Sequence, residues 1–322
     1  MTPESFSGDE ILLDYIERFS NWGRWGSDDQ LGALNFVGPD QIQAAASCVR
    51  QGKVISMTLP YDSRGPQVGP FRSNPRNLMT ATGTDYLSGK QDPLPADWGP
   101  ARGFGYADDV LIMPNQSGTQ WDGLSHIFWQ GKMWNGYDAS EVDSKGASKC
   151  GIETWQESLV MRGVLLDIAR AKNVAALEPG YPITPDDLDK AARQEQVEIR
   201  RGDAVVIRTG MMEERRHDWR DYSGGAAPGL SLHTAPWLAE HEVAAIATDT
   251  WGCEVRPNEV DLFQPLHIVA LVHMGLPFGE IWDLERIGAD CAGDGVYEFQ
   301  LCAPVLPITG AVGSPTNALA IK

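Results

Sequence analysis

The feature that most constrains the fold of this chain is an alternation of short apolar runs with amphipathic helical stretches. Three runs have the β-branched or leucine-rich composition of buried strands: GVLLDIA (163–169), DAVVIRTG (203–210) and VAAIATDTW (243–251). The stretches between them begin with helix signals, since Thr184 precedes Pro185 in one and Thr234 can cap the other. Strands that alternate with helices are typical of α/β folds, and we predict that fold class.

Segments on both sides extend this α/β unit. The stretches DEILLDYIERFSNW and PDQIQAAASCVRQG predict a helical N-terminal extension over residues 1–52. From Lys53 to Asp109, the run VISMTL predicts one strand, and the many Pro, Gly, Asn and Ser residues around it predict long loops. The tail from Val296 returns to strand and turn. The chain has no internal repeat, low-complexity segment or linker, so we expect residues 1–322 to form a single domain.

The charge of the chain limits its partners. Its formal net charge of −18 argues against DNA, RNA and anionic membranes, because binding to polyanions depends on clustered Lys and Arg. No apolar run approaches the ~20 residues of a membrane-spanning helix, and the acidic start MTPESFSGDE does not resemble a secretion signal. The five cysteines are scattered without a CxxC pair. We therefore expect a cytoplasmic protein that acts on a small-molecule substrate.

Polar side chains that can support chemistry gather in the segment QSGTQWDGLSH (116–126). Side chains of an extended segment alternate between two faces. Six residues would then share one face: Gln116, Gly118, Gln120, Asp122, Leu124 and His126. We predict that Gln120, Asp122 and His126 point into one cleft. The alternative is that Asp122 and His126 form only a hydrogen-bonded turn that caps the fold.

The same segment resembles a family signature, H-x-G-T-H-x-D-x-P-x-H. It keeps the Gly-Thr pair, Asp122 and His126, whereas Gln116 and Gln120 replace the two early histidines and Leu124 replaces the proline. The chain thus resembles the cyclase family of metal-dependent hydrolases, which includes bacterial kynurenine formamidase and isatin hydrolase. Further similar segments are RGVLLDIAR, GDAVVIRTG, ATDTWGCE, PLHIVAL, GEIWDL and PITGAVGSP. The resemblance implies a swivelling β/β/α fold and a homo-oligomer, either a dimer or a tetramer.

The resemblance also implies a site. In the family, the signature Asp bridges two metal ions, the early histidines hold one of them, and the last His shuttles a proton. On this chain that implies Asp122 as a catalytic metal ligand and His126 as the proton shuttle, with His267 and Glu280 as the later ligands. On the residues alone, His267 and its neighbour His273 could instead be core histidines, and Glu280 could be a turn residue or a helix cap.

The two glutamines change the expected metal chemistry. An amide oxygen is a weaker and harder ligand than an imidazole nitrogen, so Gln116 and Gln120 weaken one of the two metal positions. We expect one strong site formed by Asp122, His267 and Glu280, to which the glutamines add weak ligands. A divalent metal is therefore expected, manganese or zinc, and a manganese-like ion suits these ligands better than a zinc pair.

Aromatic residues near the motif, in the N-terminal segment and in similar segments predict a ring-accepting substrate pocket, although some of them must fill the core. The predicted pocket residues are Trp22, Trp25, Trp121, Phe128, Trp129 and Trp251. The predicted function is a metal-dependent hydrolase that opens an amide or lactone bond of a cyclic or aromatic small molecule, with His126 as proton shuttle. Two alternatives stay open: a dehydratase or cyclase with little use of metal, and a catalytically reduced ligand-binding protein.

Overall fold

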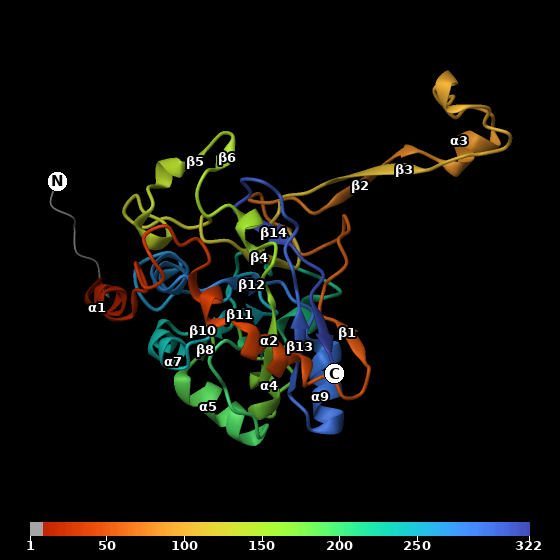
Figure 1. Ribbon diagram of the computed structural model, residues 1–322. Coiled ribbons are helices and arrows are strands. Elements are labelled where there is room, and N and C mark those ends of the chain that lie inside the picture. Colours follow the sequence, from red (N-terminus) through yellow and green to blue (C-terminus); the bar gives the residue numbers. More distant parts are fainter. Residues whose placement is uncertain (1–8) are drawn as a thin grey trace.

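The computed structural model describes residues 9–322, and a nine-stranded mixed sheet forms its centre (Figure 1). The strand order is β1-β15-β13-β7-β9-β11-β12-β4-β14. In that order the bounds are Val54–Ser56, Leu319–Ile321, Glu298–Cys302, Val160–Asp167, Ala204–Arg208, Ala245–Thr248, Phe278–Glu280, Gln120–Asp122 and Gly313–Pro315. The four strands from β7 to β12 are parallel, and the strands on both sides of them pair antiparallel.

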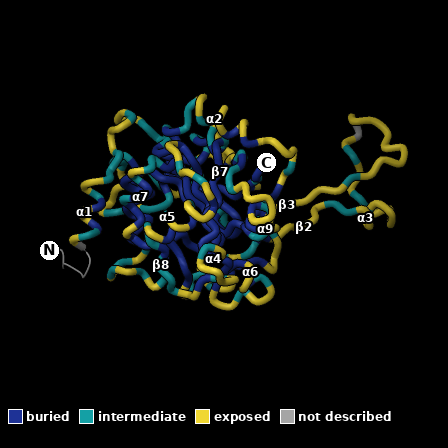
Figure 2. Tube along the Cα trace, turned by 90° about the horizontal axis from the view of Figure 1, so that it is seen from below, coloured by how far each residue is buried: buried dark blue, intermediate teal, exposed yellow. Residues whose placement is uncertain are grey.

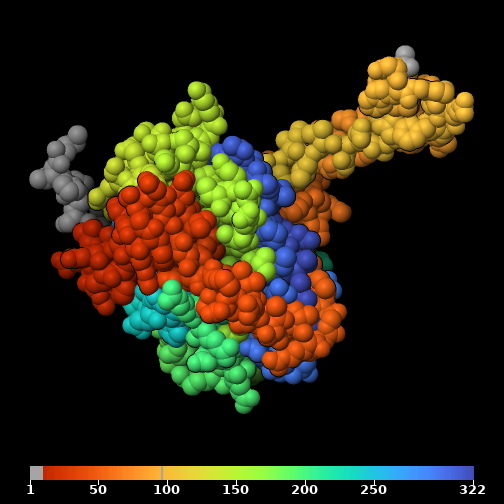
Figure 3. Space-filling view, in the orientation of Figure 1, coloured from red at the N-terminus to blue at the C-terminus, as the bar shows by residue number. Residues whose placement is uncertain are grey.

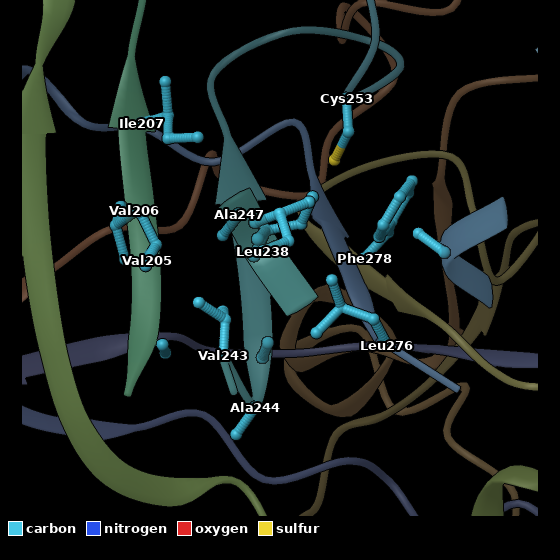
Figure 4. Packing of buried hydrophobic residues seen from close by; sticks show 14 of the residues in the cluster. Val205, Val206, Ile207, Leu238, Val243, Ala244, Ala247, Cys253, Leu276 and Phe278 are labelled. Carbon is cyan, nitrogen blue, oxygen red and sulfur yellow. The ribbon is translucent and has the colours of Figure 1, made fainter. Parts of the chain in front are cut away.

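The parallel strands correspond to the predicted apolar runs. β9 and β11 lie inside the runs predicted over 203–210 and 243–251, whereas β7 begins at Val160, before the run predicted over 163–169. Nearly all residues of the three strands are buried. In Figure 4, side chains of β9 such as Val206 pack near Leu238 and Ala247, and Leu276 and Phe278 continue the same apolar layer. Parallel strands are covered on both faces, which explains why they are continuous apolar runs without alternation.

Helices cover the sheet, and local signals define some of their ends. They are α1 (Asp9–Phe19), α2 (Pro39–Ala46), α4 (Ile168–Ala171), α5 (Pro185–Gln194), α6 (Met211–Arg215), α7 (Ala235–Glu240), α8 (Pro265–His267) and α9 (Glu285–Asp294). α5 has the predicted cap, because Thr184 Oγ1 accepts from the Asp187 amide and Asp187 Oδ2 accepts from the Thr184 amide. The predicted cap of α7 is wrong, since the Thr234 hydroxyl donates to the Ser231 carbonyl at 2.7 Å.

The N-terminal segment packs onto the sheet unit. α1 lies against α7 and the π-helix η7 (Ile268–Met274), and α2 lies against β7 and β13. The second predicted helix is too long, because α2 ends at Ala46 and does not reach Gly52. The first eight residues of the predicted extension lie outside the described residues. Over residues 9–322, no helix has the length and apolar character needed to span a membrane.

Short elements complete the chain. They are η1 (Gly32–Phe36), η2 (Ala96–Trp98), η3 (Trp134–Gly136), η4 (Ala139–Glu141), β5 (Val142–Asp143), β6 (Gly146–Ala147), η5 (Ile152–Trp155), β8 (Pro182–Ile183), β10 (Gly229–Leu230) and η6 (Leu232–Thr234). β5 pairs with β6 and β8 pairs with β10 outside the main sheet.

A hairpin arm projects from this body, where the sequence predicted only long loops. β2 (Arg76–Ala81) and β3 (Asp108–Ile112) pair antiparallel, and α3 (Gly83–Leu87) lies in the connection between them. The arm stands clear of the rest of the chain, and Figure 2 shows it as exposed along most of its length (Figures 1 and 2). The loop prediction is wrong here because both faces of the hairpin are exposed, so the sequence lacks the apolar alternation that marks a half-buried strand.

Candidate metal centre

Neighbouring strands bring together residues that are far apart in the sequence. β4 pairs with β12 so that Gln120 lies opposite Glu280 and Asp122 lies opposite Phe278. Because strand side chains alternate, Gln120 and Asp122 share one face and Trp121 lies on the other. The prediction that six residues from 116 to 126 share one face holds only for Gln120 and Asp122, the two that belong to β4. Leu124 is a core residue, and the chain turns after Asp122.

Three side chains form the centre of the site. Single ligand atoms of Asp122, His267 and Glu280 all lie within 4.8 Å of one another, and all three residues are buried. His267 belongs to α8, immediately before the π-helix, and its Nε2 lies 3.2 Å from Glu280 Oε1. Asp122 Oδ1 is buried and has no hydrogen-bond partner among the described residues. An oxygen atom in that situation fits a metal ligand, because buried polar groups normally have a partner.

Glu254 orients His267, and the sequence analysis did not identify it. The imidazole Nδ1 donates to Glu254 Oε1 at 2.5 Å, and the same carboxylate accepts from the His267 and Leu266 amides. A carboxylate on one imidazole nitrogen directs the other nitrogen to a metal ion. The signal was present in the sequence, because Glu254 is an acidic residue in the similar segment ATDTWGCE.

The electrostatics of the cluster favour a cation. Burial alone would lower the pKa of His267, but hydrogen bonds to Glu254 and Glu280 raise this pKa to about 10. Burial raises the pKa of Glu280 to about 7, and the nearby charge of Asp122 adds to this effect. Buried carboxylates at this spacing repel one another unless a positive charge lies between them. A divalent ion would supply that charge in place of the imidazole proton of His267, and the donor set of two carboxylates and one imidazole suits it.

The two glutamines occupy different positions. Gln120 Nε2 donates to Glu280 Oε2 at 2.9 Å, so this amide holds a ligand carboxylate in place. Its Oε1 is buried and has no hydrogen-bond partner in the described part of the chain. The amide of Gln116 lies beside Gly313 of β14, where a larger residue would collide with it. Metal binding by either glutamine stays a prediction.

His126 reaches the cluster from the turn after β4. Its backbone amide donates to the Gly123 carbonyl at 3.0 Å, and its Nε2 lies 3.5 Å from Asp122 Oδ1. The side chain is 19% exposed, in contrast to the three buried ligands. Burial lowers the pKa of His126, and the charge of Asp122 opposes part of that change. A partly accessible neutral imidazole can accept a proton.

A cavity of about 410 Å³ opens onto this cluster. Its lining residues are Phe71, Arg72, Asp122, His126, Ile127, Trp251, Arg256, Phe263, Gln264, His267 and Glu280. The volume is within the range of small-molecule sites. Among the aromatic residues predicted for the pocket, only Trp251 lines this cavity. The sequence analysis did not identify the two arginines, because Arg72 lies in a loop without a motif and Arg256 lies just outside the similar segment ATDTWGCE.

The other predicted pocket aromatics lie elsewhere, so the structure corrects that assignment for this cavity. Trp121 is a core residue that packs edge-on against Trp282, and Trp25 packs against the core residues Phe36 and Trp134. Trp22 stacks on His273, and neither residue lines the cavity. Phe128 is exposed and Trp129 is half-buried. Their proximity to the motif in sequence did not predict their direction, because the chain turns after β4.

Glu254 is expected to strengthen metal binding without touching the metal. Replacing it by glutamine keeps the size of the side chain but removes the charge that orients His267. We expect the metal affinity of Glu254→Gln to fall by about 10-fold to 100-fold. Titration of the metal-free protein with manganese or zinc, followed by calorimetry, measures this change. Glu178→Gln, at an exposed position, is the control for lost charge, and equal affinity of the two variants would contradict the orienting role.

Comparisons with known proteins identify the family. The sequence profile of the Cyclase family, described as "Putative cyclase", matches residues 40–255, and the chain belongs to this family. A crystal structure of a novel cyclase is 39% identical, covers 95% of this chain and 99% of its own, and superposes with a TM-score of 0.86. The predicted family and α/β fold are thereby confirmed.

More distant solved structures share the fold. Isatin hydrolase A from Labrenzia aggregata, bound to benzyl benzoate, is 18% identical over 87% of this chain and 97% of its own, with a TM-score of 0.59. Isatin hydrolase A from Ralstonia solanacearum is 17% identical over 88% of this chain and 98% of its own, with a TM-score of 0.58. None of the curated proteins that were compared matches this sequence.

Proposed function

We propose that this protein is a metal-dependent hydrolase that opens an amide or lactone bond in a cyclic or aromatic small molecule. The observation that supports this proposal best is the buried group Asp122, His267 and Glu280 at one end of a cavity, with the partly exposed His126 beside it. The family membership agrees with it, and two proteins of the same fold are named isatin hydrolases.

The residues of the site have distinct roles in this proposal. Asp122, His267 and Glu280 hold the ion, while Glu254 and Gln120 fix two of these ligands through hydrogen bonds. A divalent ion bound there polarises a carbonyl group and lowers the pKa of a water molecule. His126 accepts the proton of the attacking water at its imidazole and returns it to the leaving nitrogen or oxygen. The first transfer needs a neutral imidazole, which the lowered pKa of His126 favours, and the second uses the imidazolium that the first transfer forms.

The donor set guides the choice of metal. Two carboxylates, one imidazole and a nearby amide form a site that is rich in oxygen ligands and contains no thiolate. Such ligands suit manganese. Zinc also binds catalytic sites with imidazole and carboxylate ligands. We propose manganese as the preferred ion and zinc as the competitor.

Metal analysis together with product analysis tests the proposal. The protein is purified without added ions, analysed for metals, and incubated with isatin and with aryl lactones and amides in the presence of manganese or zinc. A metal-dependent product whose mass exceeds that of the substrate by one water supports hydrolysis. A product that has lost water without any need for metal would indicate a dehydratase, and ligand binding without turnover would indicate a binding protein.

A further inference from the structure

Two arginines line the same cavity as the metal ligands. The guanidinium carbon of Arg72 lies 5.3 Å from the ring centroid of Trp251, and that of Arg256 lies 5.9 Å from it. Arg256 also lies 5.3 Å from the Phe263 ring. The indole Nε1 of Trp251 donates to Gln67 Oε1 at 3.2 Å, so this ring is held in place. Arginines in contact with a fixed ring have restricted side-chain positions.

Neither arginine pairs with a protein carboxylate in the described residues. Arg72 donates only to the Gln116 carbonyl, at 3.2 Å, and the side chain of Arg256 makes no hydrogen bond with residues 9–322. Three other buried or half-buried arginines differ, because Arg162, Arg208 and Arg216 each pair with two carboxylates. In a chain with 44 acidic residues and 26 basic ones, guanidinium groups without a carboxylate partner inside a cavity indicate an external anion.

We propose that the substrate contains a carboxylate or similar planar anionic group that Arg72 and Arg256 bind. This inference rests on the proposed function, because it describes the substrate of that site. Guanidinium groups that lie over a ring keep N–H groups at their edges, and these donate to carboxylate oxygens. The apolar part of the substrate contacts Phe71, Ile127 and Phe263, and the bond to be broken lies at the end with Asp122 and His126.

Binding of benzoate and benzamide, which differ in charge but have nearly the same shape, tests this inference. Calorimetry on the metal-free protein and on the manganese-loaded protein measures both affinities without any turnover. We expect benzoate to bind more tightly than benzamide, and Arg72→Gln and Arg256→Gln each to weaken benzoate binding by at least about tenfold while benzamide binding is unchanged. Arg193→Gln, at an exposed position of α5, is the control for lost charge.

The outcomes separate this inference from the proposed function. Equal binding of benzoate and benzamide in both forms of the protein, or benzoate binding that the two arginine variants leave unchanged, would overturn the anion site. Such a result would not affect metal-dependent hydrolysis of neutral substrates. If benzoate binding depends on the arginines but no substrate is hydrolysed, the anion site stands and the hydrolase proposal fails.

A separate observation concerns the hairpin arm, which exposes many apolar side chains. They are Leu78, Met79, Tyr86, Leu87, Trp98, Phe104, Val110, Leu111 and Ile112, with exposed fractions between 39% and 83%. Each half-exposed side chain of this size offers of the order of 100 Å². Their combined exposed area is close to the ~800 Å² that one partner contributes to a stable interface of standard size. A two-stranded hairpin is also only marginally stable in water without packing partners.

The base of the arm borders an apolar groove of about 440 Å³. Its lining residues are Tyr61, Leu111, Met113, Cys302, Pro304, Val305, Leu306, Pro315, Thr316, Asn317 and Leu319. Figure 3 shows the arm extending away from the body, so it leaves the surface around its base open. The arm itself, residues 76–112, contains three Lys or Arg and five Asp residues, and therefore little of the net charge of −18.

We infer that a second copy of this chain covers the arm, and that the arm of each copy lies against the apolar groove of the other. Each chain presents both the arm and the groove, so a twofold dimer forms two identical contacts between the arm of one copy and the groove of the other. The low charge of the arm makes it the region where two strongly acidic chains repel each other least.

Light scattering during size-exclusion chromatography, over a range of protein concentrations, tests this arrangement. We expect the wild type to be a dimer or a larger even assembly, and Leu87→Glu and Trp98→Glu in the arm or Leu306→Glu in the groove to shift it to monomers. Val174→Glu, at an exposed apolar position outside both surfaces, is the control, and circular dichroism checks the folding of every variant. A monomeric wild type, or folded arm and groove variants that keep the wild-type assembly, would overturn the inference.

Discussion

Replacing Asp122 by alanine is expected to remove the bound metal and nearly all activity. Asp122 is the proposed ligand whose buried Oδ1 has no hydrogen-bond partner among the described residues, and it lies close to His126 as well as to His267 and Glu280. A metal ion stabilises the transition state by several kcal/mol, so its loss should lower kcat/KM by about three orders of magnitude or more. Metal analysis and steady-state kinetics on the same preparation measure both effects.

The Asp122→Asn variant is the control for packing. Asparagine fills the same space in β4 but has no negative charge, so we expect it to lose the metal and to keep the fold and thermal stability close to those of the wild type. About one ion per chain in the wild type and none in either variant would establish a metal site at Asp122. An unchanged metal content in Asp122→Ala would remove this residue from the site.

Replacing His126 by asparagine is expected to lower turnover by about 100-fold or more while the metal stays bound. The reason is that His126 lies beside the ligand cluster without belonging to it, and that its imidazole is accessible from the cavity. Metal analysis and kcat of His126→Asn test this division of roles. The matched control is His217→Asn, an exposed histidine outside the cavity, which should keep wild-type turnover.

The possible results for His126→Asn have different meanings. A near-normal rate would remove His126 from proton transfer. A variant that is inactive because it has lost its metal would instead make His126 a ligand. Taken with the Asp122 variants, the measurements therefore separate metal binding from proton transfer at two side chains that lie 3.5 Å apart.

Some parts of the site could be predicted from sequence because they depend on local geometry or on a family signature. Strand alternation placed Gln120 and Asp122 on one face, and in the structure Asp122 belongs to the ligand cluster while Gln120 donates to Glu280 of that cluster. The resemblance identified His267 and Glu280, which are more than 130 residues away in the chain, and the fold brings both next to Asp122. Periodicity could not have found these two residues, since their distance to Asp122 in space depends on strand order.

Other parts of the site needed the fold. Arg72 and Arg256 have no signal of their own in the sequence, and the role of Glu254 depends on its contact with His267, which only the fold creates. For the aromatic residues, closeness to the motif in the sequence was a misleading signal. Trp121 lies within the motif, but it occupies the strand face that turns toward the core and packs on Trp282.

The sequence by itself determined the strands of the parallel core, the cap of α5 and the residues of the candidate ligand cluster, because apolar runs, capping side chains and a signature are local properties. The tertiary structure alone decided the projecting arm, the arginines of the cavity and the direction of the tryptophans. These features depend on which surfaces face each other after folding. The arm is exposed on both faces, so its sequence shows no apolar alternation. An arginine of the cavity has a role only through the ring that it contacts and the open space beside it.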